Sequence, residues 1–163
     1  MKNKRVLVSG GSGFIGSHLV KKLLNAGAKV AITMRYGNVV ENIRVAEWWN
    51  QIEVIEADVR NRGALQAVRR FDPEVVFHLA AYQHVGQSFV QVEECFDVNA
   101  KGTANIVDVC DKAAKFVYIA TSEVYGFQEG FPFVETMVPN PQSPYAITKY
   151  AGELYCRMKQ RMG

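Results

Sequence analysis

The chain has 163 residues, of which 48% are hydrophobic and 21% are charged, and its formal net charge is +3. This length suits one domain with a full core. The charge is small and scattered, so we expect neither a nucleic acid nor a membrane surface as a partner. No stretch of the sequence is as apolar as a membrane span.

The start of the chain and its cysteines indicate a cellular compartment. The chain runs from Met1 almost directly into an apolar run, so we expect no signal peptide before it. Cys95, Cys110 and Cys156 are far apart and odd in number, so they show neither metal-ligand spacing nor a disulfide framework. We expect reduced packing cysteines in a cytoplasmic protein.

A glycine-rich turn is the first functional signal. It follows an apolar run at residues 6–8, which is typical of a buried parallel strand. It precedes a helical pattern whose apolar residues share one face: Phe14 opens it, and Ile15, Leu19, Leu23 and Leu24 follow. The turn fits G-x-G-x-x-G at Gly11, Gly13 and Gly16, or G-x-x-G-x-x-G at Gly10, Gly13 and Gly16. Such a turn before a helix N-terminus binds a pyrophosphate, and the alternative is a glycine turn without a ligand.

Strands and helices alternate along the rest of the chain. We expect the first helix to end near Asn25, with Gly27 as its cap. The elements expected after it are a strand at 29–34, a helix at 39–50 packing through Ile43, Val45, Ala46 and Trp49, a strand at 52–57, a helix at 61–70, a strand at 75–79, a loop at 82–90, a helix at 92–111, a strand at 116–120, a loop at 126–144 and a helix at 144–162. Ser143 caps this last helix, and Pro144 opens it.

This alternation predicts an α/β fold of the doubly wound type. Five parallel strands in the order 3-2-1-4-5 carry helices on both faces, and residues 1–163 form one dinucleotide-binding domain. Ligands of such sheets bind beyond the carboxyl ends of the strands.

The end of the second strand bears on the choice of cofactor. An acidic residue at this place favours NAD, but the sequence has Arg35 there and no acid. An arginine suits a 2′-phosphate, so we favour NADP(H) over NAD(H); the alternative is a surface arginine. Asp58, after the third strand, is expected either to bind the adenine amino group or to cap the helix that follows.

The candidate catalytic residues follow the fifth strand. Tyr145 and Lys149 are four residues apart and share a helix face, so the ammonium group can stabilise the phenolate of Tyr145. Tyr145 would then accept a hydroxyl proton. Thr121-Ser122-Glu123 lies at the tip of the fifth strand. The alternative is a solvated helix face that carries these residues by chance.

Six sequence segments together resemble one family. They are Gly10-Gly-Ser-Gly-Phe-Ile-Gly16, Asp58-Val59-Arg60, His78-Leu-Ala-Ala81, Asn99-Ala-Lys-Gly-Thr103, Thr121-Ser-Glu-Val-Tyr-Gly126 and Ser143-Pro-Tyr-Ala-Ile-Thr-Lys149. The chain resembles the extended short-chain dehydrogenases/reductases of the nucleotide-sugar epimerase/dehydratase group. This resemblance implies a Rossmann fold, a nicotinamide cofactor, a nucleotide-diphosphate sugar as substrate, and homodimers through helices near 92–111 and 144–162.

The resemblance also implies site residues. Those for the cofactor are Gly10, Gly13, Phe14, Ile15, Gly16, Arg35, Asp58, Val59, Leu79, Ala80, Ala81, Tyr145 and Lys149. His84 and Ser88 are expected to touch the sugar, although a lone histidine in a loop is more often only solvated. Asn99 is expected to support the backbone of the site.

The Thr121-Ser122-Glu123 motif resembles that of mannose-type 4,6-dehydratases and uronic-acid decarboxylases. The mannose-type enzymes use NADP and carry an arginine after the second strand. The implied mechanism begins when Tyr145, with Thr121, takes the proton of the sugar's 4-hydroxyl and hydride passes to NADP⁺. Glu123 then removes the C5 hydrogen, water leaves C6 and the hydride returns there; the alternative for Glu123 is a surface charge.

The resemblance fails in one respect. Family members are about twice as long and add a C-terminal substrate-binding domain, which we expect to be absent from this chain. An epimerase or decarboxylase of the same family remains an alternative. So does a non-catalytic NADP(H)-binding module or an inactive fragment.

Overall fold

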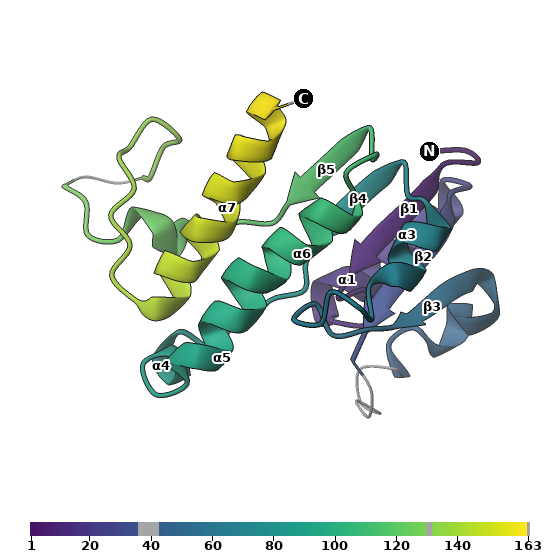
Figure 1. The fold of residues 1–163 in the computed structure, drawn as a ribbon, viewed down its shortest axis with the longest axis horizontal. Helices are drawn as coiled ribbons and strands as arrows, with labels where there is room; N and C mark the ends of the chain where they lie inside the picture. The colour runs from purple at the N-terminus through teal and green to yellow at the C-terminus, as the bar shows by residue number, and fades with distance from the viewer. Residues whose placement is uncertain (36–42, 130–131, 163) are drawn as a thin grey trace. The chain divides into compact units, whose positions relative to one another are not determined.

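In the computed structural model, which describes residues 1–35, 43–129 and 132–162, five parallel strands form one sheet in the order β3-β2-β1-β4-β5 (Figure 1). The strands are β1 (Arg5–Ser9), β2 (Lys29–Met34), β3 (Ile52–Glu56), β4 (Val75–His78) and β5 (Lys115–Tyr118). This order confirms the predicted topology. The strand order reverses between β1 and β4, which is where a sheet of this kind binds its ligand.

The chain forms two compact units. The first, Met1–Ala80 with Asn105–Ile119, contains the sheet, and the second, Ala81–Ala104 with Ala120–Gly163, is mainly helical. Within the described part of the chain, no helix combines the length and the apolar character needed to span a membrane.

Strand β1 is buried on both of its faces. Val6, Leu7 and Val8 are each 0% exposed, and successive side chains of a strand point to opposite faces. Both sides of the sheet are therefore covered at its centre, as the continuous apolar run predicts.

Helix α1 (Phe14–Asn25) packs against this sheet through Val20 and Leu23, while Leu19 and Leu24 pack at the margin. The prediction is wrong for Ile15, which is 64% exposed because it lies in the first helical turn, before the helix reaches the core. The predicted cap is confirmed. Gly27 has φ +74°, its N–H bonds to the Leu24 carbonyl at 2.9 Å, and the next N–H bonds to the Leu23 carbonyl at 3.1 Å.

The predicted helix at 39–50 is only partly testable, since residues 39–42 lie outside the described residues. Among the described residues of this range, Ile43 is helical, and the 3₁₀ helix η1 (Ala46–Gln51) follows after a turn. Of the four expected packing positions only Val45 is buried, while Ile43, Ala46 and Trp49 are exposed. Trp48 packs instead, and the Lys21 ammonium lies 5.5 Å from the centre of its ring.

The helix predicted at 61–70 starts later than expected: α3 spans Gln66–Phe71. The side-chain oxygen of Asn61 accepts the backbone N–H groups of Gly63 at 3.0 Å and Ala64 at 3.3 Å. This Asx-type turn competes with helix formation and delays the helix start.

The second unit holds the helices that carry the catalytic candidates. They are α4 (Val85–Ser88), α5 (Val92–Phe96), the π-helical segment η2 (Asp97–Lys101), η3 (Ser122–Tyr125) and α7 (Pro144–Met162); α6 (Gly102–Val109) continues from η2 into the first unit. One expectation is corrected, because the predicted loop at 82–90 contains α4. The predicted long helix at 92–111 is confirmed as far as Val109, and it contains a π segment.

Candidate active site

The glycine turn leads into an uncapped helix N-terminus. Gly13 is the N-cap of α1, and no side chain of the described residues makes a capping hydrogen bond there. The first N–H groups of α1 are therefore left for a ligand, and the helix dipole favours an anion at this end.

The turn also leaves no room for side chains. A Cβ atom on Gly16 would collide with the carbonyl oxygen of Gly10. A Cβ atom on Gly10, which has φ +68°, would lie 3.0 Å from the backbone N and Cα of Ala80. Only glycine therefore fits at these two positions, as the tight turn and close helix packing of a dinucleotide-binding fold require, so these residues fit a dinucleotide.

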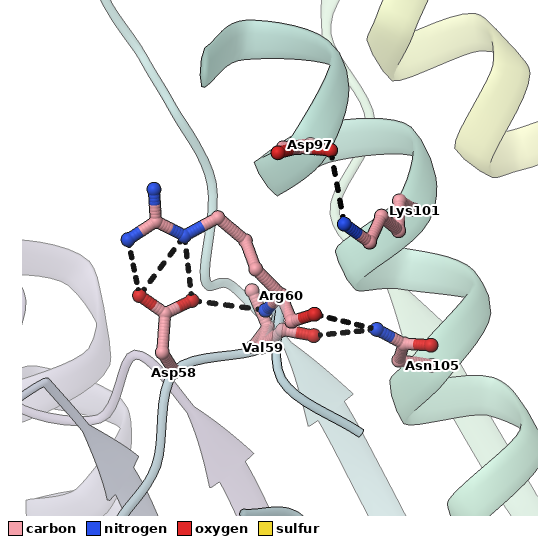
Figure 2. Close-up of polar contacts among 6 residues, drawn as sticks. All are labelled: Asp58, Val59, Arg60, Asp97, Lys101 and Asn105. Atoms are coloured by element: carbon pink, nitrogen blue, oxygen red, sulfur yellow. Dashed lines mark hydrogen bonds and ion pairs between the residues drawn. The ribbon is translucent and has the colours of Figure 1, made fainter. Parts of the chain in front are cut away.

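Figure 2 shows how the loop after β3 is held. The Nε of Arg60 donates to both carboxylate oxygens of Asp58, at 2.9 and 3.0 Å, and its Nη2 donates to Oδ2 at 2.5 Å. The side-chain amide of Asn105, in α6, donates to the carbonyl oxygens of Val59 at 2.9 Å and Arg60 at 3.3 Å (Figure 2). The predicted adenosine end of the site therefore has a fixed backbone.

These contacts keep the Asp58 carboxylate ionised. The side-chain hydrogen bond from Arg60 is the largest cause that lowers the pKa of Asp58; partial burial opposes it, and the charge of Arg35 adds a smaller effect in the same direction. Arg35 is exposed just after β2. Asp58 does not cap a helix, since α3 begins only at Gln66, so that alternative is wrong.

Thr121 opens the turn that follows β5. Its Oγ1 accepts the backbone N–H of Glu123 at 3.2 Å and so caps η3. The hydroxyl hydrogen is not used in this contact, so it can be donated to a ligand oxygen. Ser122 and Glu123 are exposed, and η3 lies against α7.

Helix α7 begins as predicted. The Oγ of Ser143 accepts the N–H of Ala146 at 3.1 Å, with Pro144 in the first helical position. Tyr145 and Lys149 follow one turn apart. Lys149 is only 4% exposed, and burial lowers the pKa of its ammonium group to about 8.

Asn99, in the π segment, ties two parts of the second unit together. Its Oδ1 accepts the N–H of Tyr82 at 2.8 Å, and its Nδ2 donates to the Tyr82 carbonyl at 3.1 Å and to Thr148 Oγ1 at 3.1 Å. Thr148 in turn donates to the Tyr145 carbonyl at 2.9 Å. Asn99 is 1% exposed, and these bonds agree with the supporting role expected for it.

The two residues predicted to touch the sugar differ in exposure. Ser88 is 0% exposed, accepts the Tyr145 N–H at 3.2 Å and donates to the Val85 carbonyl at 2.6 Å. This geometry favours a role in positioning α7. His84 is exposed, and its ring lies edge-on to Tyr82 with 6.2 Å between centroids.

The candidate residues fall into two groups. The first unit holds Gly10, Gly13, Phe14, Ile15, Gly16, Arg35, Asp58, Val59, Leu79 and Ala80, and the second holds Ala81, His84, Ser88, Thr121, Ser122, Glu123, Tyr145 and Lys149. Sequence reasoning missed Asn105, Thr148 and the buried pair of Ser9 and His78, which support these groups. The Ser9–His78 pair could have been found from the sequence, because each residue ends a predicted parallel strand. Alignment of these two strands makes Ser9 and His78 register partners.

Comparison with known proteins identifies the family of the chain. Residues 6–163 match the NAD dependent epimerase/dehydratase family. The chain is 36% identical over 162 residues to a UDP-glucose 4-epimerase of Mycolicibacterium smegmatis, covering 97% of this chain and 52% of that protein. It is 30% identical over 172 residues to a probable dTDP-glucose 4,6-dehydratase of Sinorhizobium fredii, covering 96% of this chain and 49% of that protein.

A solved structure of a relative also matches this chain. The UDP-glucuronic acid 4-epimerase of Bacillus cereus, in complex with UDP-glucuronic acid and NAD, matches with a TM-score of 0.83 and 30% identity, over 96% of this chain and 52% of that chain. This chain thus spans about half the length of the relatives that it matches. The chain belongs to the NAD dependent epimerase/dehydratase family.

Proposed function

We propose that this chain is the cofactor-binding and catalytic part of a nucleotide-sugar 4,6-dehydratase. The observation that carries the proposal is the exposed carboxylate of Glu123, two residues after Thr121 and in the same unit as Tyr145 and Lys149. Dehydration needs a base at sugar C5 in addition to the base that takes the C4 hydroxyl proton. Epimerisation at C4 needs no base at C5.

Each step of the sugar chemistry has a candidate residue. A bound nicotinamide dinucleotide would supply a reversible hydride acceptor. Tyr145 takes the proton of the C4 hydroxyl while Thr121 donates its hydrogen bond to the same oxygen, and the buried ammonium of Lys149 stabilises the phenolate. The C4 ketone makes the C5 hydrogen acidic. Glu123 removes that proton and returns it to the C6 oxygen, which leaves as water. The hydride that C4 gave up would then return to C6 while C5 takes up one proton, which balances the proton that Tyr145 removed and completes the 4-keto-6-deoxy sugar.

We further propose that the chain prefers NADP(H) to NAD(H). Arg35 is exposed at the end of β2, and its charge acts on Asp58 after β3. A guanidinium suits a 2′-phosphate, which a carboxylate at this place would repel. The backbone at Phe14, Ile15, Leu79, Ala80 and Ala81 would line the remainder of the dinucleotide.

Calorimetric titration with both cofactors tests this preference. We expect tighter binding of NADP⁺ than of NAD⁺, and an Arg35→Leu variant that binds the two equally. The exposed Arg62 of the same unit, changed to Leu, serves as the control and should keep the preference. A wild-type chain that binds NAD⁺ at least as tightly as NADP⁺ contradicts the proposal.

A 4-epimerase is the second candidate. The observation that favours it is the identity of 36% with a UDP-glucose 4-epimerase, and a uronic-acid decarboxylase would use the same Glu123. The products separate these activities: an epimer, a pentose nucleotide or a 4-keto-6-deoxy sugar.

We also propose a homodimer through α5 and α7. Five apolar side chains on these helices are between 42% and 47% exposed, as expected for a surface that a second copy covers: Val92, Phe96, Ile147, Leu154 and Met158. A cytoplasmic location stays a prediction from the sequence.

The dehydratase proposal is tested with Glu123→Gln. The chain is incubated with NADP⁺ and a panel of UDP-, dTDP- and GDP-sugars, and 4-keto-6-deoxy product is measured. Loss of a general base should slow product formation by about 100-fold or more, while Glu129→Gln, a change at another exposed glutamate, should leave the rate unchanged. Undiminished turnover by Glu123→Gln removes Glu123 from the mechanism. Dinucleotide binding without turnover of any sugar supports the alternative of a non-catalytic module or an inactive fragment.

A further inference from the structure

A buried serine–histidine pair lies beneath the glycine turn. Ser9 is the last residue of β1 and His78 the last residue of β4, and the two are register partners in the sheet. Both are 0% exposed, and Ser9 Oγ lies 2.6 Å from Nδ1 of His78. The steps assigned to the candidate active site use neither residue.

The hydrogen bonds of Ser9 determine where its hydrogen points. Its Oγ accepts the backbone N–H of Leu79 at 3.1 Å and that of Ala80 at 3.2 Å. A hydroxyl oxygen has two lone pairs and one hydrogen, so both acceptor positions are filled. This geometry favours donation of the hydroxyl hydrogen to Nδ1 of His78, which corresponds to the tautomer with its hydrogen on Nε2.

The imidazole ring has aromatic neighbours that fix its plane. The ring centroids of Phe116 and Tyr118, both on the neighbouring strand β5, lie 6.0 and 5.9 Å from that of His78. The ring is thus packed into the sheet with Nδ1 aimed at Ser9, and it has little freedom to turn away.

The hydroxyl of Ser9 connects two backbone segments that border the candidate cofactor site. The N–H of Leu79 also donates to the Ser9 carbonyl at 3.1 Å. The N–H of Ala80 donates to the Ser9 hydroxyl oxygen. The backbone of Ala80 lies so close to Gly10 that an added Cβ would be 3.0 Å from it. A shift of Ala80 would therefore disturb the glycine turn.

We propose that His78 is a positioning residue for dinucleotide binding. As the Nε2–H tautomer, it orients the Ser9 hydroxyl, which in turn holds the backbone of Leu79 and Ala80 against the glycine turn. The inference rests on the proposed cofactor site and deepens it, because it names the side chain that keeps this site in its binding shape.

The tautomer can be measured without any ligand. In ¹⁵N-histidine NMR of the wild-type chain, His78 should show a non-protonated Nδ1 and a protonated Nε2. Its signals are assigned by their loss in the His78→Asn variant, since His18 and His84 are the other two histidines and both are exposed. A protonated Nδ1, or a ring that averages between tautomers, overturns the proposal.

Variants test the positioning role. His78→Phe keeps an aromatic ring but cannot accept the Ser9 hydrogen, so we expect the Kd for NADP⁺ to rise about tenfold and the Ala80 amide to exchange faster. His78→Asn retains an acceptor and should recover most of the affinity. Val68→Ala, a change at a fully buried residue of α3, controls for lost stability alone and should leave the Kd within about twofold of wild type.

The outcomes separate this inference from the proposed function. If wild-type protein binds neither NADP⁺ nor NAD⁺, the proposed function fails, while the NMR result still decides the tautomer. If wild type binds and His78→Phe binds equally well, or if it weakens binding no more than Val68→Ala does, the positioning role is wrong.

Discussion

Changing Lys149 to methionine should make the fold more stable at neutral pH. Lys149 is 4% exposed, and burial lowers its pKa from 10.5 to about 8. This fall corresponds to about 3 kcal/mol against the charged form in the folded protein. Methionine has a similar volume and no charge, so Lys149→Met should raise the free energy of unfolding by up to about 3 kcal/mol.

The gain should depend on pH in a defined direction. Below pH 8, Lys149 is charged in both the folded and the unfolded chain, so the full penalty is present. Between about pH 8 and 10.5 the folded chain loses this proton first, and the stability of the wild type rises with pH. The advantage of Lys149→Met should therefore shrink through this window and vanish above it.

Urea unfolding near pH 7 and near pH 10 measures both effects. The exposed Lys112, changed to methionine, is the matched control and should alter stability by less than about 0.5 kcal/mol at either pH. A Lys149→Met variant that is no more stable than wild type near pH 7, or whose advantage does not shrink with pH, refutes the reasoning. A confirmed gain would mean that the chain keeps a destabilising cation, as expected of a functional site.

Three further predictions follow from packing and capping. Gly16→Ala places a Cβ on the Gly10 carbonyl oxygen, so we expect a lower Tm and no stabilisation by NADP⁺ in thermal unfolding; binding as tight as wild type would contradict the packing. Ser143→Ala removes the cap on the Ala146 N–H and should cost about 1 kcal/mol in urea unfolding, and an unchanged midpoint would show that the cap contributes nothing. Cys110 is 6% exposed and burial raises its pKa to about 12, so mass spectrometry should find it labelled by a thiol reagent only after unfolding. Rapid labelling of the native chain would argue against this burial.

The buried first strand, the glycine turn and two helix ends could be predicted because their signals are local. The run at residues 6–8 is apolar at every position and is buried in the structure. Such a continuous run is typical of a strand that is covered on both faces. The Ser143 cap and the Gly27 helix end follow from backbone groups that the nearest residues satisfy. These features depend on neighbours in sequence, so the sequence alone identifies them.

The errors arose where a distant or competing interaction decides the structure. Asn61 forms a side-chain turn that takes residues from the start of α3. The π segment places Asn99 against Tyr82 and Thr148, which a uniform helical repeat does not anticipate. The burial of Ser88 depends on the N-terminus of α7, more than fifty positions later.

Part of the candidate site was visible for a different reason. Asp58 and Arg35 could be placed near strand ends, and so near each other, from topology. The contact of the Arg60 guanidinium with Asp58, and that of the Asn105 amide with the loop after β3, could be identified only in the structure. Sequence thus predicts which residues reach the edge of the sheet, and the side-chain pairs that fix them come from the structure.

A crystal structure of the protein with NADP⁺ and a nucleotide sugar would show whether the cofactor and the catalytic candidates meet at one sugar. We expect the pyrophosphate at the N-terminus of α1, with the Tyr145 hydroxyl and the Glu123 carboxylate next to the same sugar ring. A dinucleotide bound away from the glycine turn, or a Tyr145 that faces solvent far from the nicotinamide, would contradict it.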